Sequence, residues 1–441
     1  MRIKYPVRLS SALVAALAGC VDSARVRQHD TMVAAGSHAE AEHAHARALD
    51  DASLVVNGEL DRAAIVAAVL ARNPDLDAAR ATWRAAVATY PSAVALDDPM
   101  ARYALAPFSI AASDVRFGQQ IDVSQKLPWP GTRQARGDAA IADAEAARAD
   151  LESLRLDLAE AAVQAFDQLY ITARALDINQ HHRELLERIE NSAIAQYTAG
   201  HASQQDPLEA RAHVIELERE HLMLETQRRV AVAMLNRLLR RKLDVELPPP
   251  PAHLAVAPST EGQHEHPKQL AASARIRARQ AGVDAANLAF YPSFEVMGSY
   301  DSMWDTWRHR WMIGVGIEIP LERGKRHADL ERARAEQAKA TAELASVTDM
   351  LEEGRERARS EVDESTRTLA LYEKQLLPTT RERVDAALAG FTAGQNPFST
   401  VVMAEHELRD VELAIERTRA ELDRRLAALD RLEGRIPGGA R

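Results

Sequence analysis

The sequence is poor in cysteine, in aromatic residues and in net positive charge. Cys20 is the single cysteine among 441 residues, so no disulfide can form within the chain. Aromatic residues make up 5% of the chain and charged residues 27%, and Ala, Glu, Arg and Leu fill the long middle segments. This composition is typical of long helices and coiled coils. A net charge of −10 without a concentrated basic face argues against a nucleic-acid partner.

Motifs that would indicate an enzyme are incomplete. His264-Glu265-His266 and His406-Glu407 lack the second histidine of a zinc-protease helix, and Gly314-Val315-Gly316 is not followed by the third glycine of a dinucleotide loop. A Gly-x-Ser-x-Gly elbow and a phosphate-binding loop are also missing from the sequence. We therefore expect neither an enzyme nor a bound cofactor.

The N-terminus has the features of an export signal followed by a lipidation site. A basic start precedes an apolar run at 9–17, which is too short to cross a bilayer. Leu17-Ala18-Gly19-Cys20 is typical of a lipoprotein cleavage box, so we expect a signal peptide at 1–19 and lipid on Cys20; a plain secretory signal with an incidental cysteine is the alternative. Because the next residue is Val21 and not Asp, we expect sorting to the outer membrane.

Residues 20–58 are expected to form a lipidated N-terminal tether. Within it His38, His43 and His45 are weak candidates for holding a metal ion. A solvated linker is the favoured interpretation, because nothing in the pattern fixes a coordination geometry.

The most informative feature is a duplication. Tyr197-Thr198-Ala199-Gly200 recurs almost letter for letter as Phe391-Thr392-Ala393-Gly394. Each copy ends a long helical stretch and precedes a second one, so each predicts the tip of a helical hairpin with Gly at the helix C-cap. The flanks repeat at nearly the same offset, which predicts two repeats at 59–242 and 266–434. A Pro-rich linker at 243–265, expected to lie outside the helices, joins them, and a tail at 435–441 follows.

Each repeat predicts one long helix and one shorter return helix. The long helices are expected at 132–198 and 326–392, about 100 Å each at 1.5 Å per residue, with Leu and Ala at heptad spacing. The return helices are expected at 206–241 and 397–432. Pro378 should bend the second long helix.

Each repeat also predicts two strands with a period of two, at about 100–106 and 115–127 and again at 293–304 and 307–320. Most are about as long as a tilted membrane-spanning strand, and Trp304, Trp307 and Trp311 stand where an aromatic girdle would lie. A soluble half-buried hairpin is the alternative.

Four strands cannot stand alone in lipid, because both sheet edges would leave backbone groups unpaired. Two chains would give eight strands, and three would give twelve with room for a pore. The polar residues expected on the inner face favour the water-lined version; they are Arg116, Asp122, Lys126, Glu295, Asp301 and Glu318.

The sequence resembles the TolC-like outer-membrane efflux proteins, particularly lipidated members that serve RND-type metal and drug pumps. Four features carry the resemblance: the duplicated halves, the Leu-Pro-Trp-Pro-Gly-Thr stretch at 127–132, the twin tips and the lipoprotein box. The resemblance covers about 59–432. It implies a mainly α fold with a membrane β-barrel portion: a homotrimer with a twelve-stranded barrel continued by an α-helical barrel. Tips around Tyr197, Gly200, Phe391 and Gly394 would dock on a periplasmic adaptor, and the duct would passively conduct substrates of an inner-membrane pump.

The resemblance also implies that the channel narrows beyond the tips, where polar or acidic side chains face the lumen. The first tip keeps an acid, Asp206, whereas the second has Thr400 at the equivalent place, which leaves an acidic gate in doubt. Asp206 has an equally weighted alternative as the cap of its helix. The candidate constriction residues are Asp206, Glu209, Thr400, Met403 and Glu405.

A periplasmic coiled-coil adaptor or structural lipoprotein is the alternative function. Adaptors usually carry one helical hairpin and small Gly- and Val-rich β domains, which this sequence lacks. The transported substrate, metal ion or drug, does not follow from the sequence.

Overall fold

The computed structural model describes residues 23–438 apart from 48–53, 111–115, 201–202 and 257–264, and for 39–47 it describes the backbone alone. Cys20, the lipid-bearing candidate, lies outside the described residues, as do the side chains of His43 and His45. The chain forms two compact units. The first comprises Met1–Ala39, Ala79–Leu151 and Lys268–Thr348; the second comprises Glu40–Ala78, Glu152–Pro267 and Asp349–Arg441. Each unit therefore takes segments from both sequence repeats.

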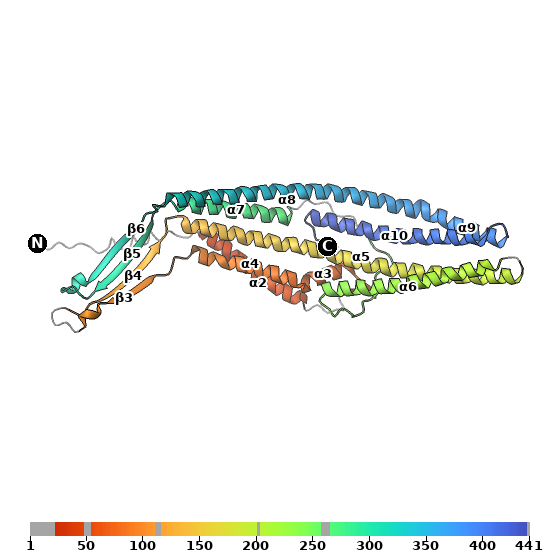
Figure 1. Ribbon diagram of the computed structural model, residues 1–441, viewed down its shortest axis with the longest axis horizontal. Coiled ribbons are helices and arrows are strands. Elements are labelled where there is room, and N and C mark those ends of the chain that lie inside the picture. Colours follow the sequence, from red (N-terminus) through yellow and green to blue (C-terminus); the bar gives the residue numbers. More distant parts are fainter. Residues whose placement is uncertain (1–22, 48–53, 111–115, 201–202, 257–264, 439–441) are drawn as a thin grey trace. The chain divides into compact units, whose positions relative to one another are not determined.

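The first unit contains one antiparallel sheet of four strands (Figure 1). They are β3 (Met100–Leu105), β4 (Gln119–Leu127), β5 (Ser293–Asp301) and β6 (Trp311–Glu318), and they pair in that order. The two central strands, β4 and β5, come from different repeats, with Leu127 opposite Phe294. The sheet therefore joins the two halves of the duplication through backbone hydrogen bonds.

All four strands are shorter than the sequence pattern predicts, β3 by a single residue, and most of the loss lies at the sheet end where β5 stops. The Ser302 N–H still donates to the Gln119 carbonyl at 3.0 Å, but the Gln119 N–H donates at 2.8 Å to the Ser302 hydroxyl, which itself donates to the Phe117 carbonyl at 2.6 Å. A side chain thus takes the place of one ladder bond, and the ladder ends there. Trp307–Arg310 then forms a 3₁₀ helix, so Trp304 and Trp307 are not on strands.

Helices α4 (Pro74–Val94), α7 (Pro267–Leu288) and the first parts of α5 (Thr132–Thr198) and α8 (Arg323–Leu371) complete the first unit. The junction between strand and helix explains the 127–132 motif. Trp129 stacks on Tyr291 with ring centroids 4.9 Å apart, and Gly131 turns the chain at φ +92 against Leu288. A Cβ-bearing residue would be strained at that φ.

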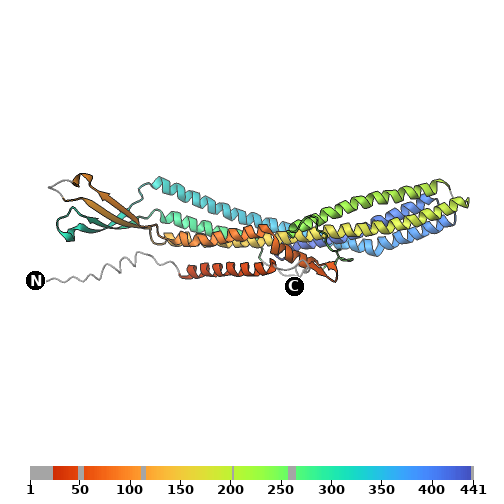
Figure 2. The ribbon, with the colours of Figure 1, turned by 90° about the horizontal axis from the view of Figure 1, so that it is seen from below.

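The expectation of a solvated tether is wrong for the part that the structure describes. Residues Ser23–Arg47 form helix α2, which lies alongside α4 in Figure 2. Arg25 pairs with Asp138 at 2.8 Å, Gln28 donates to Glu145 at 2.7 Å, and the His29 ring stacks on Tyr90. These contacts hold the segment on the first unit because its polar side chains find partners there.

The second unit is helical apart from a two-residue hairpin of β1 (Val55–Val56) and β2 (Glu59–Leu60). It contains α3 (Arg62–Arg72), α6 (Gln205–Leu238), α9 (Leu377–Thr392), α10 (Phe398–Leu432) and the remaining parts of α5 and α8. Helix α6 ends three residues before its predicted end; Arg240, just beyond it, has φ +57. Within the described residues, no helix has the length and apolarity needed to cross a membrane.

Two predictions about this unit are corrected. The second long helix is interrupted by a π-helical turn at Tyr372–Leu376, where the Leu377 N–H bonds the Tyr372 carbonyl; Pro378, which has no N–H, follows directly. The linker does not lie outside the helices over its described part. Leu247 and Leu254 are buried in the core of this unit, and the Leu60 N–H donates to the Pro249 carbonyl.

Candidate membrane wall and helical tips

The register of the sheet gathers apolar side chains on one face. Ile121 lies opposite both Tyr103 and Tyr300, and Tyr300 lies opposite Trp311. Because side chains alternate along a strand, residues two apart from these share the same face. That face comprises Ala101, Tyr103, Leu105, Ile121, Val123, Leu127, Phe294, Val296, Tyr300, Trp311, Ile313, Val315 and Ile317, with Gln119 and Gln125 as its polar members.

The opposite face is polar. The sequence predicted six residues on the inner face. Five of them lie on this polar face, namely Asp122, Lys126, Glu295, Asp301 and Glu318, whereas Arg116 precedes β4. Lys126 and Glu318 approach to 3.7 Å across this face. The strand pattern read from the sequence therefore corresponds to two chemically distinct surfaces.

The apolar face is exposed. Ile313 has 89% and Val315 65% of its surface accessible. A soluble half-buried hairpin would cover such a face with its own helices. Within the described part of the chain, β3 and β6 each pair with one strand only, so both edges of the sheet are free. Exposed apolar side chains and unpaired strand edges are unfavourable in water, so this face and both edges are candidate surfaces for contact with lipid or with further strands.

The three tryptophans stand at the end of the sheet away from the helices. Trp311 opens β6, Trp307 begins the 3₁₀ helix and Trp304 lies between β5 and that helix. All three are exposed. This is the placement that an aromatic girdle requires, although their role stays a prediction.

The two tips share a backbone geometry. Gly200 and Gly394 have φ +77 and +70, and each N–H bonds the carbonyl three residues earlier, in Tyr197 and Phe391. The side chains differ. Tyr197 is 43% exposed, whereas Phe391 is 5% exposed and packs edge to face on Phe398 with centroids 5.3 Å apart.

The candidate constriction residues have different environments. Asp206 lies in the first turn of α6, whose N-cap is Gln204, and it accepts the N–H of Ser203, which precedes the helix, at 3.3 Å; it is therefore not the N-cap residue. Glu209 and Thr400 are half-buried and Met403 is exposed. Glu405 is completely buried, so its expected place at the lumen is wrong.

Glu405 belongs to a buried ionic cluster that sequence reasoning missed. His182 on α5 lies between two carboxylates of α10, with Nδ1 2.5 Å from Glu405 and Nε2 3.0 Å from Glu412. Arg381 on α9 contacts Glu412 at 3.2 Å. The adjacent His181 and His182 were the sequence signal that could have pointed to this cluster. The partners of His182 lie more than 200 residues further along the chain.

The hydrogen bonds of this cluster favour the charged forms of His182 and Glu412. Burial alone would lower the pKa of His182, but hydrogen bonds to Glu405 and Glu412 outweigh it and raise the pKa to about 9. Burial opposes ionisation of Glu412, yet hydrogen bonds from His182 and Arg381 hold its pKa below the usual value. The cluster therefore links the first hairpin to the second as an ion pair. Among the described residues, no three potential ligands are placed to hold a metal ion.

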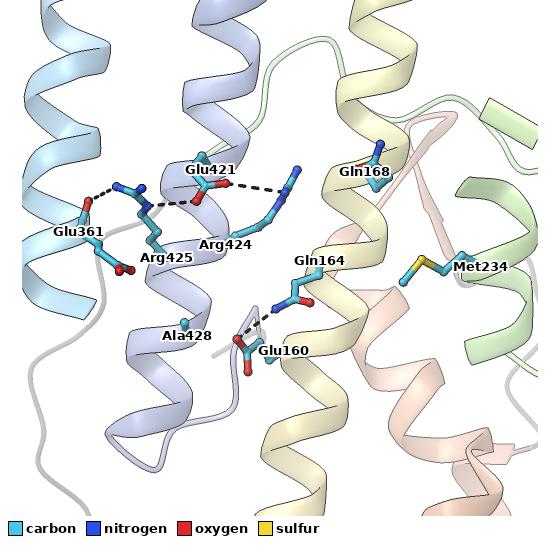
Figure 3. Close-up of a pocket in the computed structure, with 9 residues that line it drawn as sticks. All are labelled: Glu160, Gln164, Gln168, Met234, Glu361, Glu421, Arg424, Arg425 and Ala428. Carbon is cyan, nitrogen blue, oxygen red and sulfur yellow. Dashed lines mark hydrogen bonds and ion pairs between the residues drawn. The ribbon is translucent and has the colours of Figure 1, made fainter. Parts of the chain in front are cut away.

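The second unit also contains a hollow of about 480 Å³ lined by charged side chains (Figure 3). Arg425 donates to the Glu361 carbonyl at 2.8 Å and to Glu421 at 3.1 Å, and Gln164 donates to Glu160 at 3.1 Å. Because these lining groups are already paired across α5, α8 and α10, we assign the hollow to helix packing and not to a ligand.

Comparisons with known proteins agree with this architecture. Residues 262–435 match the sequence family of outer membrane efflux proteins. None of the curated proteins matches the chain in sequence. The matched residues include the second repeat, and the resemblance stated from the sequence is confirmed.

Solved channel structures share the fold. The outer-membrane channel OprN has 22% identity and a TM-score of 0.73, with 84% of this chain and 89% of that chain covered. VceC from Vibrio cholerae has 18% identity and a TM-score of 0.72 over 84% and 96% of the two chains. The open MtrE channel from Neisseria gonorrhoeae has 18% identity and a TM-score of 0.71 over 86% and 90%. The fold is that of a TolC-like efflux channel, and the adaptor alternative is not favoured.

Proposed function

We propose that this chain is one third of the exit duct of a tripartite efflux system, conducting substrates passively across the outer membrane. The observation that carries the proposal is the sheet with one exposed apolar face and two free edges. Three copies would supply twelve strands, close the edges and turn the polar faces toward a water-filled pore.

The helical part offers a second surface for association. Leu208, Ile215, Leu222 and Val230 on α6 are each about 60% exposed and stand seven or eight residues apart. Apolar residues at that spacing are typical of a coiled-coil seam. In the proposed trimer, this stripe packs against a helix of the neighbouring copy.

The N-terminus and the tips complete the proposal. Lipid on Cys20 would anchor the chain in the outer membrane. The turns around Tyr197, Gly200, Phe391 and Gly394 would dock on a periplasmic adaptor, which connects the duct to an inner-membrane RND-type pump. Asp206, Glu209, Thr400 and Met403 would line the narrowing beyond the tips. Export energy would come from the pump, so the duct itself needs no catalytic group.

The test is assembly and conductance of the mature chain. In detergent, we expect a mass of three chains plus lipid, and in planar bilayers we expect discrete ion-conducting steps. A monomer that stays in solution without detergent after removal of the lipid, and that conducts no ions, would contradict the duct and favour the scaffold.

A further inference from the structure

At the end of the sheet away from the helices, hydrogen bonds connect the described parts of the two loops. The Gly118 N–H donates to the Ser109 hydroxyl at 2.8 Å within the loop between β3 and β4. Ser302, between β5 and β6, bonds both Phe117 and Gln119. The described parts of the two loops are thus fixed to each other by hydrogen bonds.

Basic and aromatic side chains alternate on this surface. The run Trp307-Arg308-His309-Arg310-Trp311 places three basic residues between two exposed tryptophans. The Trp304 backbone carbonyl accepts Arg310 Nε at 2.9 Å and Arg116 Nη1 at 3.5 Å, which ties both guanidinium groups to the same turn.

Arg308 differs from its two neighbours. It is exposed, and the structure shows no ion pair or hydrogen bond from its side chain to any described residue. Two acids lie nearby. Asp301 accepts the Met303 N–H at 2.9 Å, and the fully exposed Asp305 approaches Arg116 to 4.0 Å. Among the described residues of this surface, Arg308 is therefore the one arginine whose guanidinium group has no hydrogen-bond or ion-pair partner.

We propose that Arg116, Arg308, His309 and Arg310, with Trp304 and Trp307, form a binding surface for the phosphate groups of the phosphorylated glycolipid in the outer leaflet. The proposal rests on the proposed function, because only a membrane-inserted sheet puts these residues at the level of the lipid headgroups. Tryptophan favours that level, and guanidinium groups form paired hydrogen bonds with phosphate. The unpartnered guanidinium group of Arg308 is the group on this surface that would pair with such a phosphate.

Binding of purified lipid A to the full-length protein in detergent tests the proposal, with native mass spectrometry to count bound lipid. Arg308→Gln should weaken binding about fivefold, the effect of one basic residue near an anionic surface. Arg308→Lys should keep most of the affinity, and lipid A stripped of its phosphates should bind no better to the wild type than to Arg308→Gln. Arg211→Gln removes an exposed arginine of α6 and serves as the matched control.

Equal binding of wild type and Arg308→Gln, or binding that ignores the phosphates, would overturn the proposal. Conductance and trimer mass are measured on the same variants in phosphatidylcholine. A conducting trimer whose lipid A binding is phosphate-independent refutes the lipid surface alone, whereas a soluble monomer refutes the duct and with it the lipid surface.

Discussion

The two repeats are alike in the sheet and different at the tips. Val123 and Val315 occupy equivalent positions of the duplication, and both lie exposed on the apolar face. Tyr197 and Phe391 are also equivalent, yet one is exposed and the other is buried against Phe398. The exposed apolar face is thus built from both halves, whereas at the second tip Phe391 packs on a second aromatic ring and at the first tip Tyr197 is exposed.

This difference shows that the duplicated turn motif encodes a backbone shape and not a common side-chain role. Both tip glycines adopt the same left-handed conformation because both helices must end there. What surrounds the turn follows from the return helix. Helix α10 supplies Phe398 and Glu405 to the interior, while α6 presents Leu208 outward. Matched substitutions in the two halves test this difference.

The largest effect is expected for Phe391→Ala. Removing a buried aromatic ring from the core around Leu186, Val401 and Phe398 should cost about 3–5 kcal/mol of tip stability. Tyr197→Ala, the matched change in the first repeat, should cost less than about 1 kcal/mol because the side chain is exposed. Thermal unfolding and protease cleavage at the tips measure both. Equal losses for the pair would contradict the asymmetry.

A somewhat smaller loss is expected for Glu405→Gln. It removes one of two carboxylates that hold the buried imidazolium of His182, and breaking such a pair should cost about 3 kcal/mol. Glu407→Gln on the same helix breaks only a surface pair with Arg383 and should cost less than about 1 kcal/mol.

The pH profile identifies the charge on His182. Its pKa is raised in the folded protein from about 6.5 to about 9, so its contribution is fully present below pH 6.5 and is lost as pH rises toward 9. Wild type should therefore lose tip stability over this range, and His182→Gln should lose less. Parallel profiles for the two proteins would show that the imidazole is neutral in the folded chain.

In the sheet, the two repeats should respond alike. Val315→Lys and Val123→Lys each place a charge on the lipid-facing surface, at a cost of about 2–4 kcal/mol per site near the bilayer centre. Ser299→Lys on the polar face should cost little. The yield of inserted, heat-resistant trimer measures the three variants. If Ser299→Lys were the most damaging, the faces would be assigned the wrong way round.

Several parts of this architecture were predictable because they depend on local patterns. The glycine tips, the alternation of the strands and the two return helices follow from short-range sequence, and the structure shows them. The predicted strand ends were wrong near Ser302, where a side-chain hydrogen bond replaces a bond of the strand ladder. The predicted position of Glu405 at the lumen was wrong because its partner, His182, lies on another helix. Contacts between distant segments leave no local periodicity that a single sequence can show.

The weakest expected effect concerns a feature found in one repeat only. Helix α2 packs on the first repeat through Arg25–Asp138 and the His29–Tyr90 stack, and the described residues between α6 and α7 contain no comparable helix before the second repeat. Because the Arg25 pair is half-exposed, Arg25→Ala should cost no more than about 1 kcal/mol. The measurement is hydrogen exchange of α2 amides, which should rise while exchange in α7 stays unchanged. Unaltered exchange in α2 would mean that the stack of His29 on Tyr90 and the buried Met32 hold the helix without the ion pair.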